Sequence, residues 1–167
     1  GIKVFYVHAR KAILKGLTPK QNREIPPLNY ERVKKLKTDF SDLEIIINGG
    51  IKELDFLKKN DLCNLDGIMI GREVYSNPLI LSGVDKILEA DLSKNNSLYD
   101  ITSEMFTYFE SLKNKNLVKR GLIHMHGLFN GHKEAKKIRI LLSNSIYLKK
   151  SKKEILSILE KSIIRAA

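Results

Sequence analysis

Three short polar motifs lie along the first half of the chain, and two of them have the residue types of an anion site. Asn48-Gly49-Gly50 ends one apolar run and comes just before a helical pattern, and Gly71-Arg72 repeats this arrangement one unit later. Glycine lets a ligand approach the backbone closely, and the free amides at a helix start attract anions. Either motif alone also fits a tight turn. The two in phase predict a phosphate site at the carboxyl ends of neighbouring parallel strands.

The third motif contains His8, and a polar loop follows it on the same expected rim. His8 ends the apolar run 3–8, where a histidine can hydrogen-bond a ligand or an RNA phosphate, or simply cap the strand end. Residues 15–27 form a long polar loop, and loops on this rim commonly build active sites. Lys20 and Arg23 in that loop could face phosphates or be merely solvated.

The other reactive side chains do not predict a catalytic or metal centre. Cys63 lies in DLCNLDG, before the third apolar run and on the side of such a fold away from the rim, so a nucleophile is not expected there. One cysteine can form neither an internal disulfide nor a cysteine-based zinc site. His124 and His126 are two residues apart and cannot share one helical face. The sequence has no HExxH, Walker A or CxxC motif.

The elements that would carry these motifs alternate between strand and helix. The short runs 3–8, 43–48 and 67–71 predict strands buried on both faces, as in a parallel sheet. Segments 29–40 and 51–59 between them repeat apolar residues at helical spacing. This order predicts an α/β fold. Three strands cannot close a barrel, so we expect the chain to be part of a longer parent protein.

The second half of the chain predicts a small helical bundle. Asp91–Asn96 is the expected linker, and four apolar stripes with helical spacing follow it. Ser97 with Asp100 resembles a capping box, and Ser151 with Glu154 forms a full one. The predicted stripes are Leu98, Ile101, Met105, Tyr108 and Leu112; Val118, Leu122, Met125 and Phe129; Ala135, Ile138, Leu142 and Ile146; and Ile155, Leu159 and Ile163.

The positive charge of the chain is concentrated in this second half. The 167 residues include 30 Lys and Arg against 19 Asp and Glu, a formal net charge of +11. Residues 1–92 have 15 basic and 13 acidic residues, whereas residues 93–167 have 15 and 6. This asymmetry suggests a polyanionic partner, although a solvated lysine-rich helical face has the same composition. Without a signal peptide or an apolar run of membrane-spanning length, the sequence predicts a soluble, cytoplasmic protein.

Five motifs in order along the chain carry a family resemblance. They are His8-Ala9-Arg10-Lys11, LKGLTPKQNREIPPL at 14–28, INGGI at 47–51, DGIMIGREVYSNP at 66–78 and HGLFNG at 126–131. Together they resemble the tRNA-dihydrouridine synthases, and more narrowly the A-type branch of that family. The resemblance covers nearly the whole chain, and the long loop motif is its most specific part.

The resemblance implies a protein with two parts. The family it resembles has an FMN-binding TIM (β/α)8 barrel followed by a helical tRNA-binding domain. On this comparison residues 1–92 are the C-terminal part of the barrel, with strands 6–8, and residues 93–167 are the helical domain. The chain is then the C-terminal portion of its parent protein.

The resemblance also implies roles for individual residues. His8 would contact the flavin, because the histidine of the family's HAR motif does. Lys136 stands where the family usually has an arginine. The positive charge remains, but a lysine cannot donate the two parallel hydrogen bonds of a guanidinium group. The implied ligands of the FMN phosphate end are Asn48, Gly49, Gly50, Gly71 and Arg72, and the implied tRNA contacts are Lys20, Arg23, Lys136 and Arg139.

The implied reaction reduces a uridine in the D-loop of tRNA to 5,6-dihydrouridine. Reduced FMN, recharged by NADPH, delivers hydride to the uracil ring, and a cysteine protonates the neighbouring carbon. The base must first leave its stack, at a cost on the order of a few kcal/mol. The family's cysteine belongs to the first half of the barrel, and Cys63 does not match it. We therefore expect the activity in the parent protein and not in this chain alone.

Two other functions remain open from the sequence. The chain could be a basic tRNA-binding module without catalysis, as the charge of residues 93–167 suggests. It could also be part of a different FMN barrel enzyme that acts on small molecules. The tRNA-type loop at 14–28 and the basic second half argue against this last function.

Overall fold

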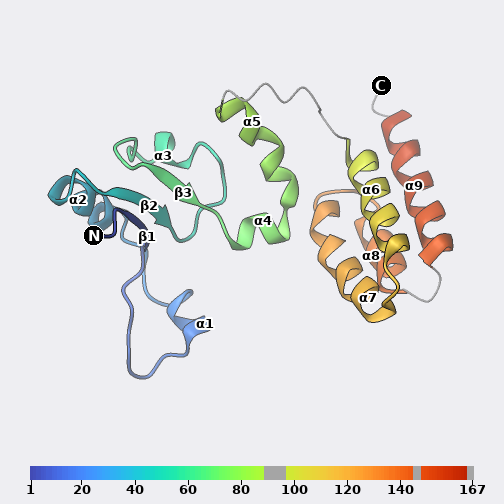
Figure 1. Ribbon diagram of the computed structural model, residues 1–167, viewed down its shortest axis with the longest axis horizontal. Coiled ribbons are helices and arrows are strands. Elements are labelled where there is room, and N and C mark those ends of the chain that lie inside the picture. The colour runs from blue at the N-terminus through green and yellow to red at the C-terminus, as the bar shows by residue number, and fades with distance from the viewer. Residues whose placement is uncertain (89–96, 145–147, 165–167) are drawn as a thin grey trace. The chain divides into compact units, whose positions relative to one another are not determined.

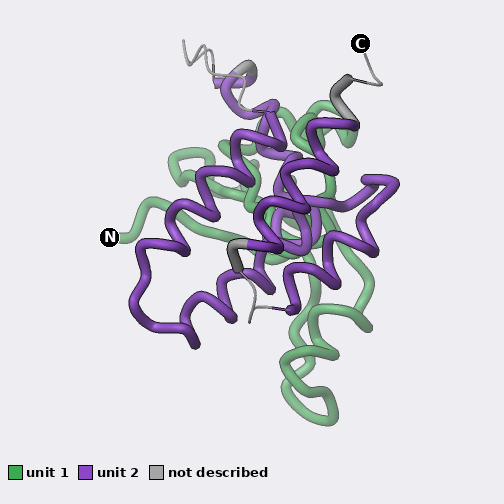
Figure 2. The backbone as a smooth tube through the Cα atoms, turned by 90° about the vertical axis from the view of Figure 1, so that its right-hand side faces the viewer, with its two compact units in different colours: residues 1–73 green, residues 74–167 purple. Residues whose placement is uncertain are grey.

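The computed structural model of the chain describes residues 1–88, 97–144 and 148–164, which are drawn as ribbon in Figure 1. The chain forms two compact units, Gly1–Glu73 and Val74–Ala167, shown in different colours in Figure 2. We call them unit 1 and unit 2. In the described part of the chain, unit 1 contains the strands and unit 2 is built from helices.

The division between the units falls after Glu73, earlier than the expected boundary at residue 92. Residues that follow Glu73 pack within unit 2, where a Cβ on Gly127 would collide with the carbonyl oxygen of Tyr75. The expected linker Asp91–Asn96 lies outside the described residues. The assignment of residues 1–92 to a barrel and of the remainder to a tRNA-binding domain therefore stays a prediction.

Unit 1 is built on a parallel three-stranded sheet, as predicted. The strands lie side by side in chain order, so the carboxyl ends of all three meet at one edge of the sheet. Each crossover contains a helix, which is typical of an α/β fold. The strands are β1 (Val4–His8), β2 (Glu44–Asn48) and β3 (Gly67–Met69).

Two helices of unit 1 pack on one face of this sheet. Helix α2 (Tyr30–Asp39) packs against β2, and its Val33 lies with Ile45 and Ile47 in the core of unit 1, each at most 1% exposed. Side chains along a strand alternate between faces, and Tyr6 on the other face is 65% exposed. The prediction that the strands are buried on both faces is wrong here, because the two helices that cover the sheet both lie on the face of Ile45 and Ile47.

The segment after Gly50 also differs from the helix predicted over 51–59. Helix α3 is a single turn, Phe56–Lys59, and begins six residues after Gly50. Ile51 is 5% exposed, so the chain enters the core of unit 1 before the helix begins. The row of free helix amides expected directly after Gly50 is therefore not formed.

Unit 2 is a small helical bundle around one apolar core, as predicted. Phe106, Phe129 and Ile138 lie in this core, each 0% exposed. The helices are α4 (Arg72–Ser76), which begins in unit 1, the 3-10 helix η1 (Pro78–Gly83), α5 (Val84–Ile87), α6 (Leu98–Ser111), α7 (Lys115–His124), the 3-10 helix η2 (Met125–Phe129), α8 (Ala135–Ser143) and α9 (Leu148–Ile164).

Three of the four predicted apolar stripes face this core wherever the structure describes them. A repeat close to 3.6 residues places the members of each stripe on one side of its helix. Ile146 and the side chain of Ile163 lie outside the described residues. The confirmed members are Val118, Leu122, Met125 and Phe129; Ala135, Ile138 and Leu142; and Ile155 and Leu159.

Helix α6 packs four of its five predicted stripe residues, Leu98, Ile101, Met105 and Leu112, against this core. Tyr108 of the predicted stripe is 57% exposed, whereas Phe106 and Phe109 are 0% and 3% exposed. Apolar residues occupy two overlapping faces of this helix. Phe106 and Phe109 extend the buried face of α6 beyond the predicted stripe, and Tyr108 stays exposed at its edge.

One predicted capping box is confirmed and the other is wrong. The Ser97 side chain accepts the Asp100 amide, and the Asp100 carboxylate accepts the Ser97 amide at 2.9 Å. Ser151, in contrast, is 5% exposed inside α9, which begins at Leu148. Glu154 lies 3.4 Å from the Lys137 ammonium instead of capping a helix.

Candidate functional site

The carboxyl edge of the sheet brings the predicted anion-binding motifs together. His8 lies opposite Asn48 in the parallel register, and Asn48 lies opposite Met69, two residues before Gly71. The Ala9 amide donates to the Asn48 carbonyl oxygen at 2.8 Å. Partners in register share a face of the sheet, so the side chains of His8 and Asn48 are neighbours at this edge.

The two glycines after β2 are required by their backbone conformation and by their neighbours. Gly49 has φ +116° and Gly50 has φ +71°, which residues with a side chain rarely adopt. A Cβ on Gly49 would lie 3.2 Å from Cε1 of His8, and a Cβ on Gly50 would lie 2.6 Å from Cδ1 of Leu28. The Tyr30 hydroxyl donates to the Gly49 carbonyl oxygen at 3.0 Å. The His8 ring therefore lies beside the Gly49 backbone.

The hydrogen bonding of His8 defines its tautomer. Nδ1 accepts the backbone amide of Arg10 at 3.2 Å, so the proton of the neutral ring is on Nε2. Partial burial lowers the pKa of His8 below the ordinary 6.5, and the positive charges of Arg10, Arg72 and Arg23 lower it further. Near neutral pH His8 is thus a neutral ring with an Nε2–H donor.

Arg72, the first residue of α4, makes this edge positive. Its Nη2 donates to the Arg23 carbonyl oxygen at 3.4 Å, and its Nη1 lies 3.5 Å from Oε1 of Glu24. The Arg72 side chain is still 63% exposed. A Cβ on Gly71 would meet no atom within 4 Å, so the backbone before Arg72 is open. An exposed guanidinium beside open glycine backbone suits a phosphate-bearing group.

Residues 9–29, between β1 and α2, form a loop that projects away from the sheet, and we call this loop the arm (Figure 1). It contains the short helix α1 (Pro19–Asn22). Lys20 lies in α1 and Arg23 directly after it, and both are exposed. We call the residues at the carboxyl edge of the sheet the strand-end site: His8, Asn48, Gly49, Gly50, Gly71 and Arg72. The hydrogen bond from Arg72 to the Arg23 carbonyl oxygen joins the arm to this site.

Cys63 lies far from these residues in the fold of unit 1. It is exposed and comes four residues before β3 begins at Gly67, at the amino edge of the sheet. The site residues lie at the carboxyl edge. In the described part of the chain, no group of three or more His, Cys, Asp or Glu residues could hold a metal ion.

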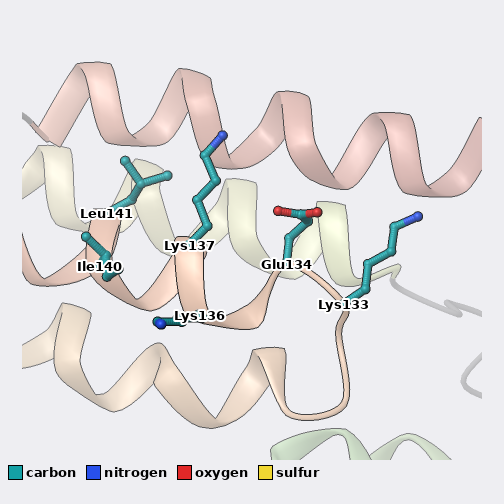
Figure 3. Close-up of a pocket in the computed structure, with 6 residues that line it drawn as sticks. All are labelled: Lys133, Glu134, Lys136, Lys137, Ile140 and Leu141. Atoms are coloured by element: carbon teal, nitrogen blue, oxygen red, sulfur yellow. The ribbon is translucent and has the colours of Figure 1, made fainter.

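Lys136 and Arg139 lie on α8, where the structure gives them different surroundings. Arg139 Nε donates to the His126 carbonyl oxygen at 3.4 Å. Burial lowers the pKa of His126, and the charge of Arg139 lowers it further. Lys136 lines a surface hollow of about 480 Å³ (Figure 3). The other lining residues are Lys133, Glu134, Lys137, Ile140 and Leu141.

This hollow combines positive charge with apolar surface. Figure 3 shows Lys137 pointing toward α9, where Glu154 lies 3.4 Å from its ammonium group. Lys136 points to another side of α8, and Ile140 is 54% exposed. Ammonium groups beside exposed apolar surface suit a polyanion that also has apolar parts.

Sequence reasoning missed two residues that shape the site. Tyr30 fixes the Gly49 carbonyl group, and nothing in its sequence context pointed to this contact. Asn22 donates to the Ile13 carbonyl oxygen at 2.9 Å and accepts the Ile13 amide at 2.8 Å, which closes part of the arm. The capping box of Thr18 and Gln21, three residues apart, was the available signal that the arm is ordered.

The fold defines an α/β unit, with the predicted anion-binding motifs at one edge of its sheet, and a helical unit that follows it in the chain. The chain belongs to the dihydrouridine synthase family, because the model of that family, described as "Dihydrouridine synthase", matches residues 1–166. Among the described residues, no helix has both the length and the apolar content that crossing a bilayer requires.

Curated relatives carry a more specific name. The chain is 45% identical over 148 residues to the "tRNA-dihydrouridine(20/20a) synthase" of Vibrio vulnificus, which covers 88% of this chain and 45% of the relative. It is 44% identical over 151 residues to the protein of that name from Pseudomonas putida, which covers 88% of this chain and 44% of the relative. It is 42% identical over 146 residues to that of Escherichia coli O6:H1, which covers 87% of this chain and 44% of the relative. The chain thus spans less than half the length of these relatives.

Proposed function

We propose that the complete protein reduces uridine to dihydrouridine in tRNA, at positions 20 and 20a as in the names of its relatives, and belongs to the A-type branch. One observation in this family member supports the proposal. Three consecutive parallel strands end in His8, Asn48-Gly49-Gly50 and Gly71-Arg72 at one edge of a sheet. Such an edge is where parallel α/β folds bind phosphates.

The proposed architecture is a TIM barrel followed by a helical domain, in the cytoplasm. Unit 1 would supply strands 6–8, and the uncovered face of its sheet, with Tyr6 65% exposed, would face the barrel interior. The helical domain would be residues 93–167. The chain's coverage of less than half of each relative leaves room for the other strands.

The proposed cofactor is FMN, with NADPH as the source of electrons. The strand-end residues fit its phosphate end, because Gly50 and Gly71 expose their backbone and the Arg72 guanidinium is open to solvent. A reduced flavin bound there would supply hydride to the uracil ring. His8 would donate a hydrogen bond from Nε2, a role for which its lowered pKa keeps the ring neutral.

The proposed tRNA contacts lie on both units. Lys20 and Arg23 are exposed on the arm, next to the strand-end site. Lys136 and Arg139 lie on α8 of the basic unit 2. Contacts of these side chains with phosphates would offset the cost of unstacking the uridine, and would weaken as salt concentration rises.

The proton donor would come from outside this chain. The only cysteine, Cys63, lies at the amino edge of the sheet, opposite to the edge that contains His8. A thiol there cannot reach a base bound at the carboxyl edge. We propose that the chain alone does not reduce tRNA.

The complete protein provides the test of this function. Arg72→Ala should lower the FMN content of the purified protein and the dihydrouridine content of tRNA in a complemented deletion strain, because one phosphate ligand is lost. Arg32→Ala is the matched control, since Arg32 is an exposed arginine of unit 1 whose charge is not among those that lower the pKa of His8. Full dihydrouridine in tRNA of the uncomplemented deletion strain would contradict the proposal.

A second candidate is a basic tRNA-binding module without catalysis. Unit 2 supports it, because this unit has its own apolar core and a basic hollow on α8. Flavin-free complete protein that binds tRNA but leaves its uridines unreduced would favour this candidate. Bound FMN with unchanged tRNA would instead indicate a flavin enzyme that acts on small molecules.

A further inference from the structure

The arm presents an apolar side chain to solvent. Leu14 is 93% exposed, and no described residue covers it. Ile13 and Ile25 on the same arm are 41% and 59% exposed, and α1 has no buried residue. A single exposed leucine is ordinary on a protein surface, so its meaning depends on how the arm holds it.

Hydrogen bonds fix the base of the arm. The Asn29 amide donates to the Ala9 carbonyl oxygen at 2.7 Å, and the Arg10 guanidinium donates to the Pro26 carbonyl oxygen. Arg10 and Leu28 also form an antiparallel bridge. The chain segments that enter and leave the arm are therefore bonded to each other where they meet the sheet.

A second set of hydrogen bonds fixes the part of the arm that contains Leu14. The Asn22 side chain both accepts from and donates to the backbone of Ile13, at 2.8 Å and 2.9 Å. The Thr18 amide donates to Oε1 of Gln21 at 2.8 Å, which starts α1. Leu14 directly follows the clamped Ile13, so its backbone is held while its side chain stays in water. A loop ordered in advance loses less entropy on binding.

The charges around Leu14 indicate what the arm meets. Residues 11–24 contain the basic residues Lys11, Lys15, Lys20 and Arg23, against one acidic residue, Glu24. No ion pair joins Lys11 or Lys15 to another residue that the structure describes. An apolar tip between free ammonium groups is complementary to RNA, which offers phosphates next to the apolar faces of its bases.

We propose that Leu14 is a wedge that enters the base stack of the tRNA where the reacting uridine leaves it. This inference rests on the proposed function and adds a positioning residue to it. A base that leaves its stack creates a gap, and proteins that distort nucleic acids insert apolar side chains such as leucine between base steps. The ammonium groups of Lys11 and Lys15 bind the flanking phosphates.

The test uses the complete protein and a tRNA with 2-aminopurine next to the reacting uridine, whose fluorescence rises on unstacking. Leu14→Ala should lower the fluorescence rise at saturating protein at least about twofold and kcat/KM about tenfold, while the Kd for tRNA changes less than about threefold. Leu14→Met should restore both signals, because methionine is apolar and similar in volume. Lys15→Ala should instead raise Kd and flatten its salt dependence, with the fluorescence at saturation unchanged.

Ile25→Ala is the matched control, because Ile25 is another exposed apolar residue of the arm. It should leave fluorescence and kcat/KM within about twofold of the original protein. The proposal is overturned if Leu14→Ala unstacks and reduces the tRNA normally. It is equally overturned if Leu14→Ala lowers the melting temperature or the flavin content, since Leu14 then packs against the protein itself. A full loss of dihydrouridine chemistry in the unsubstituted protein would refute the proposed function instead.

Discussion

The two units bury their apolar residues in different ways. In unit 2 the helices surround one core, in which Phe106 and Phe129 are 0% exposed. In unit 1 two helices cover one face of the sheet, and Tyr6 on the other face is 65% exposed. Parallel sheets are normally covered on both faces. Unit 2 thus has a closed apolar core among its described residues, whereas the sheet of unit 1 has one uncovered face.

The largest expected effect is in the core of unit 2. Phe106→Ala removes a fully buried ring from the closed core and should lower the free energy of unfolding by about 3–5 kcal/mol. Urea denaturation followed by circular dichroism measures this change. A loss below about 1 kcal/mol would show that the core of unit 2 is not closed.

Tyr108→Ala is the matched control on the same helix. Tyr108 is 57% exposed, so its truncation should cost less than about 1 kcal/mol. If Tyr108→Ala destabilised the protein more than Phe106→Ala, Tyr108 would lie in the core, as the predicted stripe had it, and Phe106 would not.

A smaller loss of stability is expected when the charge of the Asp66 carboxylate in unit 1 is removed. Asp66 accepts the Ile45 amide at 2.7 Å and lies 3.0 Å from the Lys37 ammonium. Asp66→Asn keeps an acceptor but removes the charge, so it should cost about 1 kcal/mol at pH 7. Asp39→Asn, at an exposed pair with Lys35, should cost only about 0.3–0.5 kcal/mol.

The cost of Asp66→Asn should also depend on pH. The Ile45 amide and the Lys37 charge lower the pKa of Asp66 below 3.8. The folded protein therefore favours the carboxylate, and this stabilisation is present above pH 3.8 and lost as the pH falls through the lowered pKa. Denaturation at pH 7 and pH 3 should show the difference between the two proteins shrinking in acid. If the two proteins differed by the same free energy of unfolding at both pH values, the charge of Asp66 would not contribute to stability.

The smallest effect is expected at the strand-end site. Arg72→Ala should raise the pKa of His8 toward 6.5, although partial burial, the largest cause of the lowering, remains. The signal of the His8 ring in an NMR titration measures this pKa, with Arg32→Ala as the control. A lowered histidine pKa costs stability as the pH falls below 6.5, so Arg72→Ala should also reduce that acid sensitivity. An unchanged pKa of His8 would show that the charge of Arg72 does not act on the His8 ring.

The sequence was informative where one physical signal dominated. Short runs rich in β-branched and aromatic residues predicted the strands and placed Asn48 and Gly71 at one edge, because parallel strands share their carboxyl edge. The sequence failed over 51–59, where burial of Ile51 competes with helix formation. In α6 it identified four of the five stripe residues correctly, but packing buries Phe106 and leaves Tyr108 exposed.

The candidate site was predictable in its members more than in its contacts. The glycines of the strand ends were identified by residue type, and positive φ values at Gly49 and Gly50 explain why glycine is needed. The bonds from Tyr30 to Gly49 and from Asn22 to Ile13 join residues far enough apart that no local pattern encodes them. Lys136 and Arg139 share a helix, yet only the folded chain shows that Arg139 is bonded to the His126 carbonyl oxygen.

The position of Cys63 has a practical consequence. The chain has one thiol, and it is exposed at the edge of the sheet away from His8 and Arg72. A maleimide dye would therefore attach at one known place without any substitution. The fluorescence of this label would report binding of the chain to another molecule, and the residues of the strand-end site would remain unmodified.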